Sequence, residues 1–239
     1  MRGLLNQNKW RVRLWGSLAV AAAGCTHALQ INNTGAYYKI AHAPKRLAIR
    51  LVDASLGDGQ QLFQATYEAL RTHPDVADVL LKDQEPERAT DATVTLRTTT
   101  KYDGSGWNYL ITFPGFILFT HAWNGFVYKA DVSTEVEVAL NGNANKTAHT
   151  IDTSYDLRHC DFGRGAAASS GWYLPGWGGT NLIVGLFMIS YDTDVTPEFL
   201  EKVRPTYGAY IANSVVEAIG SPAPAVAPAA AADRPCFAG

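Results

Sequence analysis

The sequence lacks the short motifs that mark common enzyme and metal sites. The His-Cys-Asp triplet at 159–161 has no second His or Cys pair at zinc spacing, and adjacent strand residues point to opposite faces. The Gly-Ser-Gly triplet at 104–106 is not a Gly-x-Ser-x-Gly nucleophile elbow. The Asp-Phe-Gly triplet at 161–163 has neither a glycine-rich phosphate loop nor a catalytic-loop Asp beside it. We therefore predict a protein that is not an enzyme and requires no metal or cofactor.

Basic clusters are absent as well. The chain carries 20 Lys and Arg against 22 Asp and Glu, a formal net charge of −2. Residues 1–24 hold four basic residues and no acidic one, so the remainder has 16 against 22, a net charge of −6. A mildly acidic chain without Lys/Arg clusters lacks the electrostatic footprint of a nucleic-acid-binding protein. We expect no nucleic-acid partner.

No apolar run near the start is long enough to span a bilayer, which requires roughly 20 helical residues. The basic segment before Leu14, the short apolar run and the small residues at 21–24 are typical of a signal peptide over residues 1–24. A transmembrane anchor and ordinary cleavage after the alanines at 21–23 are the alternatives.

The boundary itself, Ala22-Ala23-Gly24-Cys25, resembles the lipobox of bacterial lipoproteins. The resemblance implies removal of the leader and a diacylglycerol cysteine at Cys25, with palmitate-type acyl chains holding the protein to the membrane. Thr26 follows, where an Asp would favour inner-membrane retention in that family. We therefore expect an outer-membrane lipoprotein of the cell envelope, with its domain facing the periplasm.

Cysteine is scarce, with three residues in the chain. If Cys25 is acylated, Cys160 and Cys236 remain and can form one disulfide in an oxidising compartment. The count permits this bridge but does not require it.

Periodicity predicts the elements of one domain over residues 45–220, after a polar lipidated tether at 25–44. Alternation predicts strands at 46–53, 76–81, 92–98, 131–140 and 147–158, the last two joined by a turn at Asn141-Gly142. Asp58 with Gln61 forms a capping-box signature for a first helix.

A second helix is expected from Thr196, as N-cap, to Gly220, with Pro205 kinking or dividing it. Asp192 and Asp194 precede that helix, where acids serve the dipole and caps more often than a cation. Residues 221–239 form an Ala/Pro-rich tail.

This element order predicts an α+β or α/β two-layer sandwich, with a mixed sheet of about five to six strands and two helices. Between Arg46 and Val94 the order resembles the α/β core of envelope lipoproteins, such as curli-channel lipoproteins and the lipoprotein activators of penicillin-binding proteins. The resemblance ends at Gly106, where the composition changes.

Two stretches, Trp107–Tyr128 and Gly165–Tyr191, contain no Asp, Glu, Lys or Arg and are rich in aromatic residues, glycine and proline. They flank the 131–158 hairpin, so we expect them at the same end of the sheet. Three alternatives are open: core strands and loops, a patch facing lipid or a protein partner, or insertion as a barrel. The predicted patch comprises Trp107, Phe116, Trp123, Trp172, Trp177 and Phe187.

The favoured function is therefore a non-catalytic outer-membrane lipoprotein, an accessory to envelope assembly or to a transport or secretion machine. Its expected partners are the membrane, through the lipid anchor, and other envelope proteins, and it can form an oligomer. One alternative is a membrane-inserting oligomeric export pore. Another is an envelope hydrolase, for which no residue of the sequence argues.

Overall fold

The computed structural model describes residues 28–32, 41–85, 87–112, 124–142, 146–161, 164 and 186–220. Their elements are β1 (Ala28–Ile31), β2 (Leu47–Asp53), α2 (Asp58–Thr72), β3 (Val76–Leu81), β4 (Ala92–Gly104), α3 (Trp107–Thr112), β5 (Phe126–Leu140), β6 (Lys146–His159), the short 3₁₀ turn η3 (Thr193–Val195) and α7 (Thr196–Gly220). The signal peptide, Cys25 and the Ala/Pro-rich tail lie outside the described residues, so the predicted segment boundaries stay predictions.

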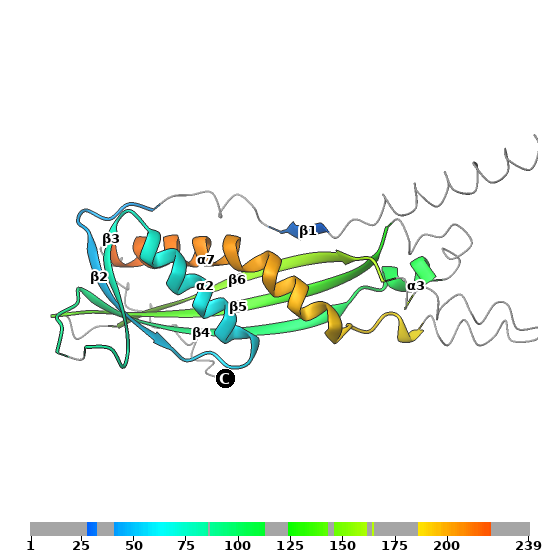
Figure 1. Ribbon diagram of the computed structural model, residues 1–239, viewed down its shortest axis with the longest axis horizontal. Helices are drawn as coiled ribbons and strands as arrows, with labels where there is room; N and C mark the ends of the chain where they lie inside the picture. Colours follow the sequence, from blue (N-terminus) through cyan, green and yellow to red (C-terminus); the bar gives the residue numbers. More distant parts are fainter. Residues whose placement is uncertain are drawn as a thin grey trace, which may run out of the picture.

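The six strands form one mixed sheet in the order β1-β6-β5-β4-β2-β3. Strand β2 pairs in parallel with β3 and β4, whereas β4, β5, β6 and β1 pair antiparallel. Helices α2 and α7 lie on one face of this sheet (Figure 1). The predicted α+β sandwich with a mixed sheet is confirmed, with the short α3 as a third helix that the periodicity did not predict.

The central strands are longer than their predicted cores. Strand β5 begins at Phe126 instead of Asp131, and β4 continues to Gly104 instead of ending at Thr98. The reason is that the alternation of inward and outward side chains continues beyond the predicted bounds: in β5, Phe126, Tyr128 and Ala130 face the helices just as Val132 does. Figure 1 shows these strands running past the helices to α3.

The core lies between the sheet and the two helices. Alternate residues of β5, including Val132, Val136 and Val138, are buried against α2 and α7. The buried hydroxyl of Tyr207 on α7 is hydrogen-bonded to Thr98 Oγ1 at 3.1 Å and to Thr134 Oγ1 at 2.5 Å. This pairing satisfies polar groups that would otherwise be costly to bury.

The predicted capping box of the first helix is wrong, although α2 does begin at Asp58. The N-cap is Gly57, which has φ +56° and no side-chain cap hydrogen bond. The Asp58 carboxylate accepts a hydrogen bond from the Tyr102 hydroxyl at 2.8 Å. Asp58 therefore ties the helix start to β4 and does not cap its own first turn.

The start of α7 also differs from the prediction. Thr196 already has helical dihedrals, and the cap lies upstream, where the Asp192 carboxylate accepts from the Asp194 amide at 3.2 Å. Asp192 thus caps the turn η3 that leads into α7, and Asp194 contributes its amide to this cap. The helix continues through Pro205 undivided, because both Pro205 and Glu201, whose carbonyl loses its partner there, face solvent. Neither α7 nor any other helix in the described ranges is both long and apolar enough to cross a membrane.

Residues 28–31, which the sequence assigned to an irregular tether, form strand β1 on the edge of the sheet. They pair antiparallel with β6, where Ala28 is opposite Arg158 and Ile31 is opposite Tyr155. Leu29 and Ile31 pack on the core, whereas Ala28 and Gln30 face solvent. This short alternation was hidden by the polar residues on either side of it.

Candidate functional site

The candidate site is the end of the sheet where α3 and residues 186–190 lie, called the uncharged end below. Within the described residues, the exposed large apolar side chains are Trp107 (67 % exposed), Leu110 (47 %), Leu186 (60 %), Phe187 (69 %) and Leu56 (83 %). Four of these five come from the two uncharged stretches of the sequence. Several exposed apolar side chains at one end of a domain are typical of an interaction surface.

The two stretches meet at this end, as expected from their positions around the hairpin. A Cβ added at Gly104 would lie 1.7 Å from the carbonyl oxygen of Ile189, so the backbone of the second stretch rests directly on the end of β4. The ring of Tyr191 stacks on Tyr102 with centroids 4.7 Å apart and meets Tyr128 edge-on at 5.5 Å. Only glycine permits this close approach at position 104.

Helix α3 is fixed by the polar contacts of Asn108 and by the burial of Ile111, while Trp107 and Leu110 stay exposed. The buried side chain of Asn108 donates to the Val127 carbonyl at 2.9 Å and accepts from the Val127 amide at 2.7 Å. These are the two bonds that a neighbouring strand would make, so Asn108 replaces the ladder where β4 ends. Because the helix is held in this way, Trp107 and Leu110 can point outward.

The second stretch is fixed by Arg164, whose side chain is 13 % exposed. The guanidinium donates to the Tyr128 hydroxyl, to the Asp192 carboxylate at 3.1 Å and to the Ser190 carbonyl at 3.1 Å. It also lies over the ring of Phe126, 5.6 Å from the centroid. One planar cation therefore joins the end of β5 to the segment that carries Leu186 and Phe187.

The aromatic residues under this end are shielded from water. Burial raises the pKa of Tyr128 to about 12, although the Arg164 guanidinium opposes the shift. Burial, followed by the hydrogen bond to Asp58, also raises the pKa of Tyr102 well above its usual range. Both phenols are therefore neutral hydrogen-bonding groups at physiological pH, and neither is prepared to act as a base.

The side chains of the triplet at 159–161 do not converge on one point. This agrees with the expectation that adjacent strand residues point to opposite faces. His159 Nδ1 lies 2.6 Å from Glu198 Oε2, whereas Asp161 accepts a hydrogen bond from the Arg164 amide at 2.9 Å. Cys160 is buried and disulfide-bonded. Within the ranges that the structure describes, no group of three or more His, Cys, Asp or Glu side chains could hold a metal ion.

Six of the predicted site residues fall outside the described residues. They are Cys25, Phe116, Trp123, Trp172, Trp177 and Cys236. The pairing of Cys160 with Cys236 therefore stays a prediction, as do the lipidation of Cys25 and the role of the aromatic patch. Trp107 and Phe187 are the two patch residues that the structure places, and both are exposed.

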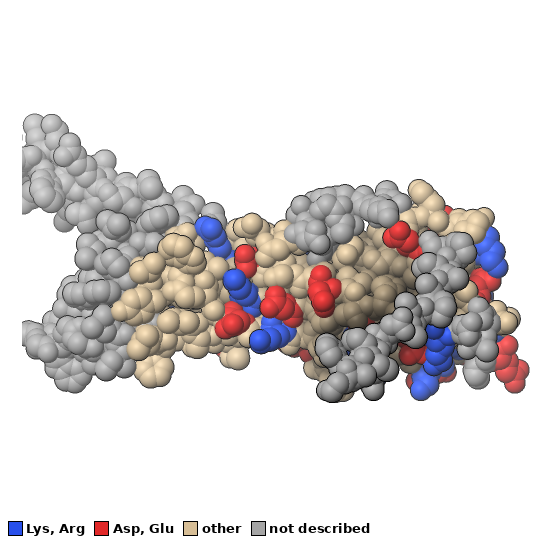
Figure 2. Space-filling view, turned by 180° about the vertical axis from the view of Figure 1, so that it is seen from behind, with Lys and Arg blue, Asp and Glu red and all other residues tan. Residues whose placement is uncertain are grey.

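Charge separates this end from the rest of the molecule. The open face of the sheet, away from the helices, carries mixed basic and acidic side chains, such as Arg97 beside Glu135 and Lys146 beside Glu137. Figure 2 shows this face with its blue and red residues, which stop short of the end that continues into grey. The described surface at that end is tan. Contact with an apolar partner there therefore carries little desolvation cost.

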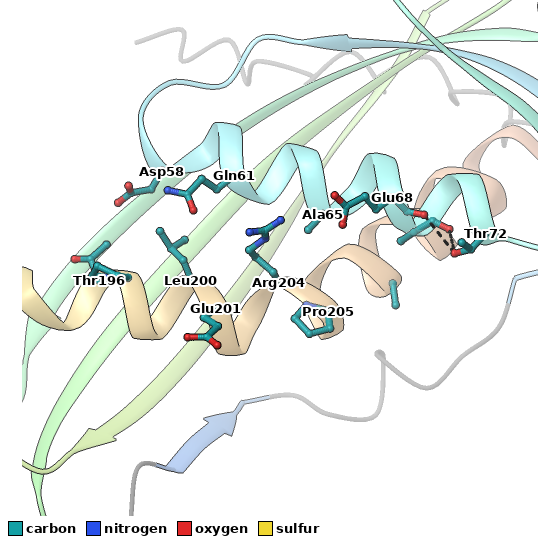
Figure 3. Close-up of a pocket in the computed structure, with 13 residues that line it drawn as sticks. Asp58, Gln61, Ala65, Glu68, Thr72, Thr196, Leu200, Glu201, Arg204 and Pro205 are labelled. Carbon is teal, nitrogen blue, oxygen red and sulfur yellow. Dashed lines mark hydrogen bonds between the residues drawn. The ribbon is translucent and has the colours of Figure 1, made fainter.

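A hollow of about 740 Å³ lies between α2 and α7 (Figure 3). Its ionisable lining residues are Asp58, Glu68, Glu201 and Arg204, and its described lining holds no His or Cys. Asp58 is already bonded to Tyr102, Glu201 is exposed on α7, and the half-buried Arg204 points from α7 toward α2 (Figure 3). This arrangement forms no nucleophile–base pair, so the hollow does not argue for catalysis.

Sequence analysis missed Asn108 and Arg164, the residues that hold the uncharged end together. Asn108 lies in the uncharged stretch 107–128, and no sequence period distinguishes a buried Asn side chain from an Asn side chain in an exposed loop. Arg164 carried a weak signal, since it is the last charged residue before a stretch of 27 uncharged ones. A cation at such a boundary is a reasonable candidate for anchoring the apolar segment that follows.

Comparisons with known proteins give a limited result. No protein-family model matches the chain, and the comparison with curated proteins found no match. Among solved structures, one similar chain is that of a dodecamer of a PelC point variant from Paraburkholderia phytofirmans, at 12% identity and a TM-score of 0.28. The alignment covers 68% of this chain and 96% of that one. A similarity of this size carries no argument about what the chain does.

Proposed function

We propose that this protein is a non-catalytic lipoprotein of the bacterial outer membrane, an accessory to envelope assembly or export. It is anchored through Cys25 and contacts the bilayer a second time through its uncharged end. The observation that carries the proposal is that both segments at the uncharged end, α3 and residues 186–190, expose apolar side chains (Trp107, Leu110, Leu186 and Phe187) while polar contacts hold them in place.

The anchor and the surface support each other. An acyl chain on Cys25 keeps the domain beside a bilayer, where an exposed Trp and several apolar side chains gain free energy by entering the interface. The diacylglycerol group on Cys25 supplies the attachment to the membrane, and a second contact through the uncharged end would fix the orientation of the domain against the bilayer. A water-facing surface of this composition without a partner would favour aggregation instead.

The anchor is tested with Cys25→Ser in the full chain expressed in a bacterium that lipidates its envelope proteins. We expect loss of fatty-acid labelling and accumulation of unprocessed precursor. The peptide map of unreduced wild-type protein adds a check: acylated Cys25 leaves Cys236 as the disulfide partner of Cys160. A Cys25–Cys160 disulfide, or normal labelling of the variant, would contradict the anchor.

The surface is tested with a diazirine-labelled phospholipid in vesicles carrying the lipidated full chain. After illumination, we expect lipid adducts on peptides containing residues 107–112 and 186–190. The matched control is the peptide with Leu56, which is equally apolar and more exposed but lies in the body of the domain. Equal labelling of all three peptides, or adducts on none, would contradict bilayer contact at the uncharged end. Protein adducts there instead would assign the surface to a protein partner.

A further inference from the structure

A hollow of about 550 Å³ lies where the uncharged end meets the charged open face of the sheet. Its apolar side is formed by Trp107, Leu110 and Ile111 of α3, and its polar side by residues of β5, β6 and the turn before β5. The complete lining is Ser105, Trp107, Leu110, Ile111, Asn124, Val127, Lys129, Asp156 and Arg158. A site with one apolar wall and a few converging polar groups is typical of ligand binding.

The polar side brings two cations and one carboxylate together. Lys129 of β5 is directly opposite Asp156 of β6, and Val127 is opposite Arg158, so all three charged side chains project from the same face. Arg158 donates through Nη1 to Asn124 at 3.0 Å, which orients its guanidinium toward the turn and leaves further N–H groups for a ligand. Lys129 and Arg158 together present two positive charges beside an apolar wall.

Asp156 has a buried carboxylate oxygen that lacks a hydrogen-bond donor, and this is the strongest indication of a ligand. Its Oδ1 atom is buried, and no hydrogen-bond donor for it exists among the described residues. A buried carboxylate oxygen without a donor is costly, so the site favours an occupant that supplies an N–H or O–H group. No described residue of the sheet donates a hydrogen bond to this oxygen, although Lys129 is directly opposite Asp156 on the neighbouring strand.

We propose that this hollow binds the zwitterionic headgroup of a phosphatidylethanolamine-type phospholipid, an inference that rests on the proposed membrane contact. The headgroup phosphate pairs with Lys129 and Arg158, and its primary ammonium donates to Asp156 Oδ1. The glycerol and the first acyl carbons lie against Trp107 and Leu110, at the level where those side chains enter the bilayer. The phosphate thus meets cations, the ammonium meets a carboxylate, and the apolar part of the lipid meets apolar side chains.

The primary ammonium sets the specificity. A choline headgroup has the same charge but no N–H, so it leaves Asp156 Oδ1 without a donor. A phosphoglycerol headgroup offers hydroxyl donors but has no cation to offset the carboxylate. We therefore expect the order ethanolamine, then glycerol, then choline, with about a tenfold difference between the first and the last from one charge-assisted hydrogen bond.

The test uses the full chain in a non-ionic detergent and water-soluble dihexanoyl phospholipids with ethanolamine, glycerol or choline headgroups. Affinity is measured by calorimetric titration for wild type and three variants. Asp156→Asn should remove the preference for ethanolamine over choline, and Lys129→Gln should weaken both several-fold. Asp103→Asn is the matched control, because Asp103 faces Lys129 from β4 but does not line the hollow, and it should change neither.

Equal wild-type affinity for ethanolamine and choline, or an ethanolamine preference that survives in Asp156→Asn, would overturn the proposal. Tighter binding of a soluble oligosaccharide than of any lipid would also overturn it and assign the hollow to a carbohydrate. The membrane contact can fail separately. Vesicle adducts at 107–112 without a headgroup preference would support the proposed function and contradict the headgroup site. A headgroup preference without vesicle adducts would support the site and contradict the membrane contact.

Discussion

The body of the sheet and its uncharged end share the three strands β4, β5 and β6. The body buries its apolar side chains, whereas the end exposes several of them. In the body, Val136 and Val138 face the helices and are fully buried. At the end, Trp107 and Phe187 are about two-thirds exposed. The body is stabilised mainly by burial, whereas the end combines the burial of Ile111 and Met188 with the hydrogen bonds of Asn108 and Arg164.

The difference indicates that the fold can hold the end in place while its large apolar side chains stay exposed, so their exposure is not a packing defect. A segment held only by burial could not expose its largest side chains without losing its position. Because polar groups fix the backbone of α3 and of residues 187–192, the apolar side chains are available to a partner. The comparison can be tested by removing one kind of support at a time.

The largest effect is expected for Phe199→Ala in the buried core. Phe199 is 1 % exposed and packs edge-on against Tyr102 and Tyr155, each with centroids 5.7 Å away. Its truncation should lower the free energy of unfolding by about 3–5 kcal/mol, measured by urea denaturation. Phe187→Ala, the matched change at the end, should cost less than about 0.5 kcal/mol. Similar losses for the two variants would show that Phe187 is a core residue.

An intermediate effect is expected for Arg164→Met. The change removes the hydrogen bonds to Tyr128, Asp192 and Ser190 and should cost about 2 kcal/mol, because the Asp192 charge loses its partner. Amide hydrogen exchange should accelerate at 187–192 and stay slow in the body strands. Arg50→Met is the control, since Arg50 also donates to backbone carbonyls, those of Gln84, Glu85 and Arg88, but in the body. Faster exchange at 187–192 in Arg50→Met would contradict the local role of Arg164.

The smallest effect concerns pH at the junction of the two regions. Burial alone would raise the pKa of Glu198, but hydrogen bonds from Lys202 and His159 outweigh it and hold the pKa below its usual 4.5. The resulting stabilisation is present above pH 4.5 and is lost as the pH falls through the lowered pKa. We expect a contribution of less than about 1 kcal/mol, because the pair is partly exposed.

Glu198→Gln measures this contribution. Urea denaturation of both proteins at about pH 6 and at successively lower pH should show wild type more stable at the higher pH and the two converging in acid. A gap between the proteins that stays constant with pH would contradict the assignment.

The strands of the body could be predicted from the sequence because alternation there coincides with alternation of charge. In β5, Val132 and Val136 alternate with Asp131 and Glu135, so one face is unambiguous. The same period continues through Phe126 and Tyr128, but these residues belong to the uncharged aromatic stretch 107–128, so the pattern alone does not distinguish a strand there from a loop. The register with β6, in which Ala139 is opposite Lys146, differs from the one that a two-residue turn at Asn141-Gly142 would give.

The candidate site could be located but not built from the sequence. Its position follows from the two uncharged stretches flanking one hairpin. Its architecture depends on long-range contacts, such as Asn108 with Val127 and Arg164 with Tyr128, which no local pattern encodes. The cap of α2 was mispredicted for a related reason, since a partner 44 residues away, Tyr102, engages the Asp58 carboxylate that the local motif assigned to capping.

The most direct test of the account is hydroxyl-radical footprinting of the lipidated full chain, in detergent and after transfer into vesicles. We predict that labelling of Trp107, Leu110, Leu186 and Phe187 falls several-fold in vesicles while labelling of Leu56 is unchanged, since these five are comparably accessible in the free domain. Unchanged labelling of the first four residues would contradict the claim that the uncharged end meets the bilayer.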